Sequence, residues 1–416
     1  MATKRRTAAG ALSAAALALA VTATTAPDAA ARPHRLAVRL MSAAADGTPA
    51  NDEVSAPAIS ADGRYVAYST KAGNLVPGDT NGLEDVFVKD VRTGRITRIA
   101  APERGPGIGA RAVEPSLSAD GRRLVFRSFV VKSNHNSPPD YSSHIHVVDL
   151  RTGRMEQADV GLTAPDGGSS RNPAIAADGR SVTFTSGRYL LSPLGDYIGR
   201  ARLWKRDLVH RTSTLLAASP RAAIERGTFS RDGRRLVYED LAGGVSGRWT
   251  SEIHTRDLRT GKDERLDVPY DGSDDQQHSS DPSVSPDGRY AQFTSRADNL
   301  LPGGTRGSDY VYLRDLRGGG LRRITAPGDD WSSHGEFAAD GRLLAFAGGS
   351  QVYLRDLRTG RTRLVSVTPG GAPGNESSGK PAPSDRGDAV AFSSRATDLV
   401  PGVDGQYGQV YLRHMN

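Results

Sequence analysis

Short apolar stretches with alternating polar positions recur along this chain, and tight polar turns separate them. In the segment PAISADGRYVAYS, residues 57–69, two such stretches flank ADGR, where Asp and Gly favour a tight turn. The pattern therefore predicts two short antiparallel strands. A third strand is predicted in DVFVKDV, residues 85–91, and a fourth after the RTG turn that follows. After the first 31 residues no helical period of useful length appears.

This four-stranded unit repeats along the chain. Related first segments begin at residues 57, 115, 173, 227, 282, 336 and 381. A relative of DVFVKDVRTG follows each of them, and the last copy stops at QVYLRHMN without its fourth strand. Four-stranded units repeated in this way are typical of a β-propeller. The sequence therefore predicts an all-β, seven-bladed β-propeller.

The two ends of the chain predict how the ring closes. The segment RLAVRLMS, residues 35–42, reads as a strand that belongs to no unit of its own. Residues 39–90 align without a gap on residues 363–414, which places this strand where the fourth strand of the last blade is missing. We therefore expect the N-terminal strand to complete the seventh blade and to pair its open edge.

The repeats resemble a known family. The segments SADGRYVAYS and DVFVKDVRTG, with their six relatives, resemble the TolB-type, WD-like propeller repeats of bacterial secreted and periplasmic proteins. The resemblance covers essentially all of the chain after residue 31, and it implies the fold rather than a function, because propellers host many unrelated roles. TolB carries an additional domain before its propeller. Here only residues 32–56 separate the leader from the first repeat, so TolB's role in an outer-membrane complex is not carried over.

The first 31 residues read as an export signal. MATKRR is basic, AAGALSAAALALAVTATTA is apolar, and DAAARP supplies small residues for cleavage after Ala31. A membrane anchor is the alternative reading of this segment. We expect a signal peptide at 1–31 and a mature propeller at 32–416, secreted or associated with the cell envelope. The general secretory and twin-arginine routes both stay open.

Composition narrows the range of functions. With 37% hydrophobic and 24% charged residues the chain suits a folded, soluble protein, and the absence of cysteine excludes disulfides and thiol chemistry. The leader carries a net charge of +2, so the formal charge falls from +7 to +5 in the mature chain. Scattered arginines of this kind do not indicate nucleic acid. We expect a monomer with no transmembrane segment after the leader.

One position can be followed around the ring. In an up-and-down blade the connections before the first strand and after the second lie on one face, and here they are the long, variable ones. We expect the residues just before the first strand of each blade to converge at the mouth of the central channel. A mixed polar ring there would recognise a glycan or a peptide terminus, whereas solvated strand entries are the plain alternative. The residues are Ala56, Glu114, Asn172, Arg226, Asp281, His334 and Lys380.

Two further candidates belong to loops on this face. Trp331, near His334, would either stack on a sugar or pack over the blade. Asp79, Asn81 and Asp85 in NLVPGDTNGLED have the alternating spacing of a calcium loop. Related segments at 299–310, 398–409 and 190–196 keep the apolar pair and the proline but lose the acids, so the motif is predicted as a blade cap. Calcium stays open there, and no other cofactor is expected.

Two periodic sets are interpreted as structural. His146 and His254 occupy a position where the other blades carry an aromatic ring, which favours packing over metal binding. An aspartate ends the third strand in six blades, and its period favours a role in the following turn. These aspartates are Asp90, Asp149, Asp207, Asp257, Asp315 and Asp356.

Enzyme signatures are not found: the sequence holds no nucleophile elbow, zinc-helix motif, phosphate loop or dinucleotide fingerprint. We therefore expect a binding protein whose partner is an extracellular protein, a peptide or a cell-wall glycan. The alternative is a glycan-active enzyme, a polysaccharide lyase or hydrolase, with its site at the channel mouth. A structural role in the envelope is a third reading.

Overall fold

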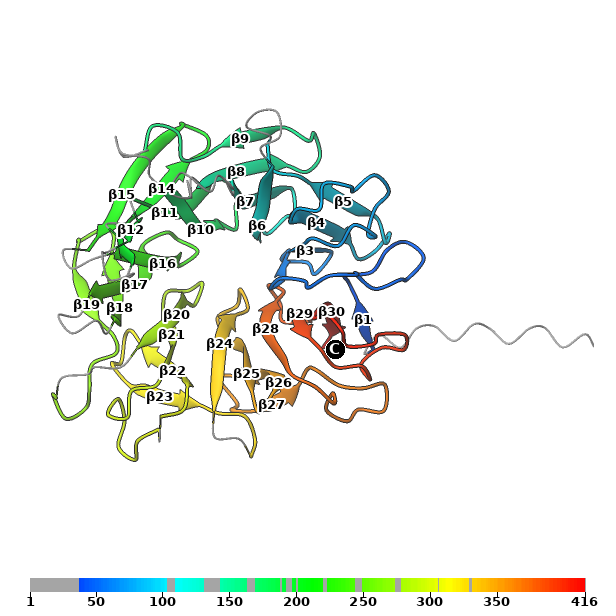
Figure 1. Ribbon diagram of the computed structural model, residues 1–416. Helices are drawn as coiled ribbons and strands as arrows, with labels where there is room; N and C mark the ends of the chain where they lie inside the picture. Colours follow the sequence, from blue (N-terminus) through cyan, green and yellow to red (C-terminus); the bar gives the residue numbers. More distant parts are fainter. Residues whose placement is uncertain are drawn as a thin grey trace, which may run out of the picture. The chain divides into compact units, whose positions relative to one another are not determined.

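Within the compact unit Arg35–Asn416, seven four-stranded antiparallel sheets follow one another around a common axis (Figure 1). A computed structural model describes residues 37–102, 109–130, 143–162, 169–187, 189–191, 197–199, 201–219, 223–243, 249–273, 278–305, 307–328 and 331–415. The innermost strand of each blade contacts the next blade, and contacts between the first and last blades close the ring. The predicted seven-bladed β-propeller is therefore confirmed. The proposed signal peptide lies outside the described residues.

Each blade runs from the channel outwards in chain order, as the hydrophobic pattern predicts. Blade 1 holds β2 (Ala58–Ile59), β3 (Tyr65–Thr70), β4 (Asp85–Asp90) and β5 (Ile96–Ile99). Blade 2 holds β6 (Ala110–Leu117), β7 (Arg123–Val130), β8 (Ser143–Asp149) and β9 (Met155–Gln157). Blade 3 holds β10 (Ser169–Ile175), β11 (Ser181–Gly187), β14 (Arg202–Asp207) and β15 (Thr212–Ala218), with an added hairpin of β12 (Tyr189–Leu191) and β13 (Tyr197–Gly199).

The remaining blades repeat this plan. Blade 4 holds β16 (Ala223–Phe229), β17 (Arg235–Gly243), β18 (Trp249–Asp257) and β19 (Asp263–Arg265). Blade 5 holds β20 (Ser279–Val284), β21 (Tyr290–Ser295), β22 (Tyr310–Asp315) and β23 (Leu321–Ile324). Blade 6 holds β24 (Ser332–Phe337), β25 (Leu343–Gly348), β26 (Gln351–Asp356) and β27 (Thr362–Leu364). Blade 7 holds β28 (Ser378–Pro383), β29 (Ala389–Ser394) and β30 (Gln409–His414), and its outermost strand is β1 (Val38–Leu40).

The N-terminal strand closes the ring as predicted. β1 pairs with β30 in antiparallel register, with Val38 opposite Arg413 and Leu40 opposite Tyr411 (Figure 1). The backbone N–H of Met41 donates to the Val410 carbonyl at 2.8 Å, and the Met41 side chain is buried in the core. The observed strand is shorter than the predicted segment 35–42 but occupies the expected place.

Apolar clusters fill the spaces between successive sheets, and ring pairs within the blades contribute to them. In blade 2 the His146 ring stacks on Phe126 with centroids 5.4 Å apart, and in blade 4 His254 stacks on Tyr238 at the same distance. Four other blades use two aromatic rings at the same place. The interpretation of both histidines as packing residues is confirmed.

The strand-end aspartates cap their turns, as predicted. Asp90 Oδ1 accepts the backbone N–H groups of Arg92 and Thr93, and the same pair of bonds recurs at the other five aspartates. In the described part of the chain, no helix is long and apolar enough to span a membrane.

Candidate functional site

The seven residues expected at the channel mouth line one cavity of about 400 Å³. Each comes from the innermost strand of its own blade or, in blade 1, from the residues just before that strand. The structure therefore brings all seven together, as the repeat alignment predicts. That they bind a ligand stays a prediction. The residues are Ala56, Glu114, Asn172, Arg226, Asp281, His334 and Lys380.

The local backbone differs from the prediction. These residues were expected just before the first strand, but in blades 2–7 they lie within it, at a β-bulge that shifts the register. In blade 2, for example, the shift falls between Val113 and Ser116, and Glu114 lies inside it. A bulge leaves its extra residue out of the ladder and re-aims the side chain. The predicted position, just before the first strand, is therefore wrong for these blades, because the strand begins upstream. Whether these residues bind a ligand or are simply solvated is a separate question that this position does not decide.

The bulge imposes an unusual backbone conformation. Five of the seven mouth residues are non-glycine residues with φ between 48° and 56°. Asn and Asp tolerate this left-handed region, whereas Glu and Lys adopt it at a cost, and glycine would adopt it freely. Strain of this kind persists where the side chain itself is required. The five residues are Glu114, Asn172, Asp281, His334 and Lys380.

Polar contacts link the mouth residues of neighbouring blades. Arg226 donates a hydrogen bond to Asp281 Oδ1, and His334 Nε2 lies 3.8 Å from Asp281 Oδ2. On the other side of the ring, Glu114 Oε2 accepts the backbone N–H of Asn172 at 3.0 Å. The Glu114 carboxylate also pairs with Arg127 at 3.3 Å. The ring is therefore held in place by contacts between blades.

Three carboxyl groups that the sequence reasoning missed surround this ring. Burial raises the pKa of Glu239 to about 8, and the nearby carboxylates of Asp281 and Glu225 add to the shift against Arg226. Burial likewise raises the pKa of Glu225. The enclosing protein raises the pKa of Glu336 to about 7, although that side chain is exposed to the lumen. Groups that titrate near neutrality are those able to exchange protons or to respond to a ligand's charge.

Desolvation raises the pKa values of these carboxyl groups but lowers the pKa of the His334 imidazole, because the charged form of histidine is the protonated one. Burial is the largest cause of the lowered pKa of His334; the Asp281 carboxylate opposes this shift, and the cationic groups of Lys380 and Arg226 add to it. The His334 imidazole is therefore neutral at neutral pH. Its Nδ1 contacts the Ser333 hydroxyl at 2.9 Å, which leaves Nε2 directed toward Asp281.

Trp331 is not among the residues that line the mouth cavity. It precedes β24 and keeps 36% of its surface exposed. Stacking of a sugar on Trp331 therefore stays a prediction, separate from the cavity itself.

The structure brings the proposed calcium ligands together around an arginine. Arg98 Nε donates to Asp85 Oδ2 at 2.6 Å, and its guanidinium lies 3.1 Å from Asp79 Oδ1. Asn81 Nδ2 donates to the same Asp85 oxygen at 3.1 Å. In blade 5 the equivalent Arg323 donates to the Gly304 carbonyl, where blade 1 has Asp79. The arginine thus holds the loop in both blades, and calcium binding stays untested.

The apolar part of this loop packs as a cap, as predicted. Leu75 is buried against the core between blades 1 and 7, and Leu300 and Leu399 are buried at the equivalent places in blades 5 and 7. The fourth, fainter copy at residues 190–196 falls on side chains that the structure does not describe.

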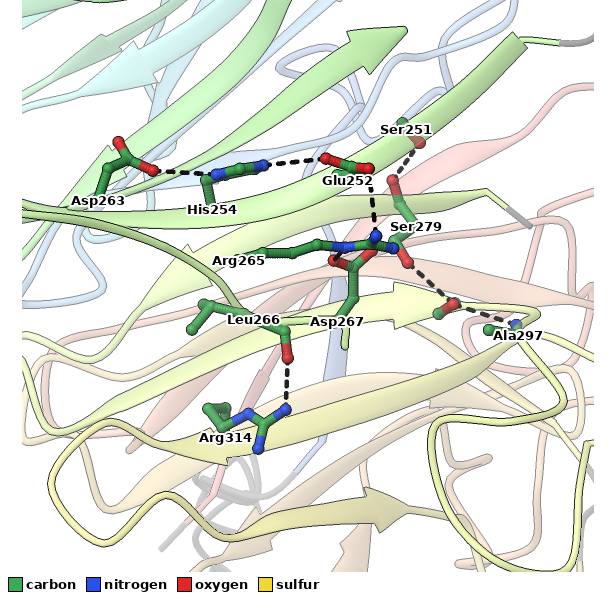
Figure 2. Close-up of polar contacts among 11 residues, drawn as sticks. Ser251, Glu252, His254, Asp263, Arg265, Leu266, Asp267, Ser279, Ala297 and Arg314 are labelled. Carbon is green, nitrogen blue, oxygen red and sulfur yellow. Dashed lines mark hydrogen bonds and ion pairs between the residues drawn. The ribbon is translucent and has the colours of Figure 1, made fainter. Parts of the chain in front are cut away.

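A second polar network lies at the outer edge of blade 4 (Figure 2). Arg265 lies between the buried carboxylate of Asp267, at 2.8 Å, and Glu252, at 3.2 Å. His254 lies between Asp263, at 2.9 Å, and Glu252, at 3.2 Å. Blade 2 has a polar network of His144, Gln157 and Asp159 at the matching positions. The network of blade 4 is therefore a variant of a contact that the repeat uses elsewhere. Within the described ranges, no group of three or more His, Cys, Asp or Glu residues is placed to hold a metal ion.

Comparisons with known proteins define the fold. No family model matches the sequence, and no curated protein sequence matches it. The structure is similar to an oligogalacturonate lyase in complex with manganese, with 15% identity and a TM-score of 0.55 over 88% of this chain and 90% of the lyase. It is also similar to the oligogalacturonate lyase from Vibrio parahaemolyticus, with 12% identity and a TM-score of 0.57 over 92% and 95%. TolB from Acinetobacter baumannii matches at 18% identity over 80% and 76%, with a TM-score of 0.40.

At these identities, the likeness to the two lyases shows that the chain is a β-propeller. The chemistry has to be argued from the chain's own site.

Proposed function

We propose that this chain is a secreted propeller of the TolB-type repeat group that acts by binding. Its channel mouth holds the end of a polar ligand, which belongs to an extracellular protein, a peptide or a cell-envelope polysaccharide. The observation that carries the proposal is the set of non-glycine residues with positive φ around the mouth. Six blades place a bulge there, yet the side chains differ from blade to blade. A purely structural bulge would favour glycine or asparagine throughout.

The polar character of the cavity supports a polar ligand. Amide, guanidinium, imidazole, ammonium and carboxylate groups face a single space of about 400 Å³. Pockets that fix a ligand's orientation use a few convergent polar groups of this kind. A broad apolar surface, which would favour docking of a large partner, is not part of this cavity.

A glycan and peptide array probed with the mature chain tests the proposal. The mouth variant carries Glu114→Ala, Arg226→Ala, Asp281→Ala and His334→Ala. A matched control replaces four exposed arginines of the turns on the opposite face, Arg92, Arg151, Arg259 and Arg358, with alanine. We expect the control to bind as the wild type does and the mouth variant to lose binding. Equal binding by the mouth variant would show that the ligand site lies elsewhere.

A glycan-active enzyme is the second candidate, and one observation favours it. Glu336 lines the cavity together with His334 and Arg226, and its pKa is raised to about 7, as in general acids and bases. Incubation of wall and plant polysaccharides with the protein, followed by detection of unsaturated products and new reducing ends, tests it. Products formed by the wild type and absent with Glu336→Gln would support a lyase or hydrolase.

A further inference from the structure

Below the mouth, the innermost strands carry a ring of small, uncharged residues with one exception. Two positions after the mouth residue, six blades carry Ala, Ser or Thr, and blade 6 carries Glu336. We call this ring the waist. Its neutral members are Ala58, Ser116, Ala174, Thr228, Ser283 and Ala382.

Glu336 is the charged residue that the mouth cavity shares with a second cavity of about 320 Å³ further down the channel. Among the described residues, no hydrogen bond or ion pair engages its carboxyl group. The accessible surface of the side chain faces the lumen, where the small waist residues leave space beside it. A carboxylate held in an enclosed place without a counter-ion is costly, and a cationic ligand group would remove that cost.

The charged groups around Glu336 do not supply this counter-ion. Asp281 raises its pKa further and Arg226 lowers it, but Arg226 is already engaged by Asp281. Glu225 and Glu239, whose pKa values are raised by burial, line neither cavity. His334 and Lys380 line the mouth above, and Arg231 and Asp385 line the cavity below. The residues that line the two cavities thus carry charges of both signs, and in the described part of the chain no cation among them is paired with Glu336.

The far end of the channel is crossed by an ion pair. Arg231 Nη2 lies 3.0 Å from Asp385 Oδ2, and these residues belong to the first turns of blades 4 and 7. In a ring of seven, blades 4 and 7 stand on opposite sides, so the pair spans the lumen. A ligand that enters at the mouth would therefore present an end to the waist and would not thread through the channel.

We propose that the waist binds a primary ammonium group at the end of the ligand, with Glu336 as its counter-ion. This inference rests on the proposed function, because it takes the mouth as the entrance. An amino sugar and a peptide N-terminus both supply this group. The ammonium donates hydrogen bonds to the Glu336 carboxylate. Thr228 lines both cavities with Glu336, and its hydroxyl oxygen, which already accepts the backbone N–H of Val284, has a second lone pair for the ammonium.

Calorimetry on the mature chain tests the inference with paired probes. Glucosamine oligomers are compared with N-acetylglucosamine oligomers, and trialanine with N-acetyl-trialanine. A charge-assisted bond of about 1.5–3 kcal/mol corresponds to a preference of at least about tenfold for the free amine. We expect this preference in one probe pair, which identifies the source of the ammonium.

The variants are Glu336→Gln, which is neutral and nearly isosteric, and Glu376→Gln, an exposed control. Glu336→Gln should abolish the preference while keeping the wild-type melting temperature, since the other blades have neutral residues at the waist. Glu376→Gln should leave the preference unchanged. If Glu336→Gln does not fold, the pH dependence of wild-type binding replaces it.

Binding should weaken as the pH falls below about 7, because Glu336 then takes up a proton. Protonation of His334 above the waist acts in the same direction by adding positive charge. Equal affinity for free and acetylated probes, or a preference that survives Glu336→Gln, would overturn the inference. If the array finds an amine-free ligand that the mouth variant loses, the proposed function stands and the inference fails. If no ligand depends on the mouth, both fail.

Discussion

Arg98 lies against two acidic side chains of the first blade, 2.6 Å from Asp85 Oδ2 and 3.1 Å from Asp79 Oδ1. Asp85 is fully buried, and burial raises the pKa of Asp79 even though Arg98 opposes that shift. Arg98→Met would leave both carboxyls without a counter-ion. We expect a loss of about 3 kcal/mol in the free energy of unfolding, measured by urea denaturation. Arg122→Met, an exposed arginine, is the control and should change little.

The same contact predicts the response to calcium. Since Arg98 already neutralises Asp79 and Asp85, we expect calcium to leave the melting temperature of the wild type unchanged. Differential scanning calorimetry with calcium and with a chelator checks this. A calcium-dependent rise that is lost in Asp79→Asn would establish a metal site in this loop and overturn the ion-pair interpretation.

The strained mouth predicts a gain in stability when function is removed. Lys380 has a φ of 48°, so Lys380→Gly relieves backbone strain and should stabilise the fold by about 1 kcal/mol. Lys71→Gly is the matched control, because Lys71 is exposed and has no positive φ, and it should lose up to about 1 kcal/mol. Ligand affinity should fall for Lys380→Gly and stay unchanged for Lys71→Gly. A loss of stability at Lys380 would argue against strain at the bulge.

His254 predicts a pH dependence of stability. Burial alone would lower its pKa, but the hydrogen bonds to Asp263 and Glu252 outweigh this and raise the pKa above its ordinary value. A histidine with a raised pKa in the folded state stabilises the protein at low pH, and this contribution disappears as the pH rises through the folded-state pKa. The melting temperature of His254→Phe relative to the wild type, followed from pH 5 to 8, should be lowest at the acidic end. The Phe ring keeps the stack on Tyr238, so an offset that is constant with pH would contradict this role.

Ring closure predicts a large effect of the N-terminal strand. A mature chain that begins at residue 43 lacks β1 and the buried Met41 side chain. We expect it to lose at least about 3 kcal/mol and to expose the edge of β30 to self-association, as seen by light scattering. A chain that begins at residue 37 keeps β1 and is the control. If the two chains melt alike, β1 would not be what closes the ring.

The repeat made the fold and the mouth ring predictable, because one aligned position must recur at one place in each blade. The bulge could not be predicted, since Glu114 in the left-handed region has no local sequence signal comparable with that of a glycine. The exceptional charge of Glu336 was present in the alignment, but its significance depends on which face of β24 meets the lumen. The Arg98 contact was missed because it joins the fourth strand to a loop before the third, and repeat spacing does not report side-chain reach.

The pairing of β1 with β30 also sets the order in which the protein can be completed. Val38 is synthesised 375 positions before its partner Arg413. The strand β1 must therefore wait without its partner until β30 has been made, and closure carries the entropic cost of a very long loop. A ribosome-bound or prematurely ended chain can build six blades but leaves the seventh open. Closure of the ring therefore cannot precede the synthesis of β30.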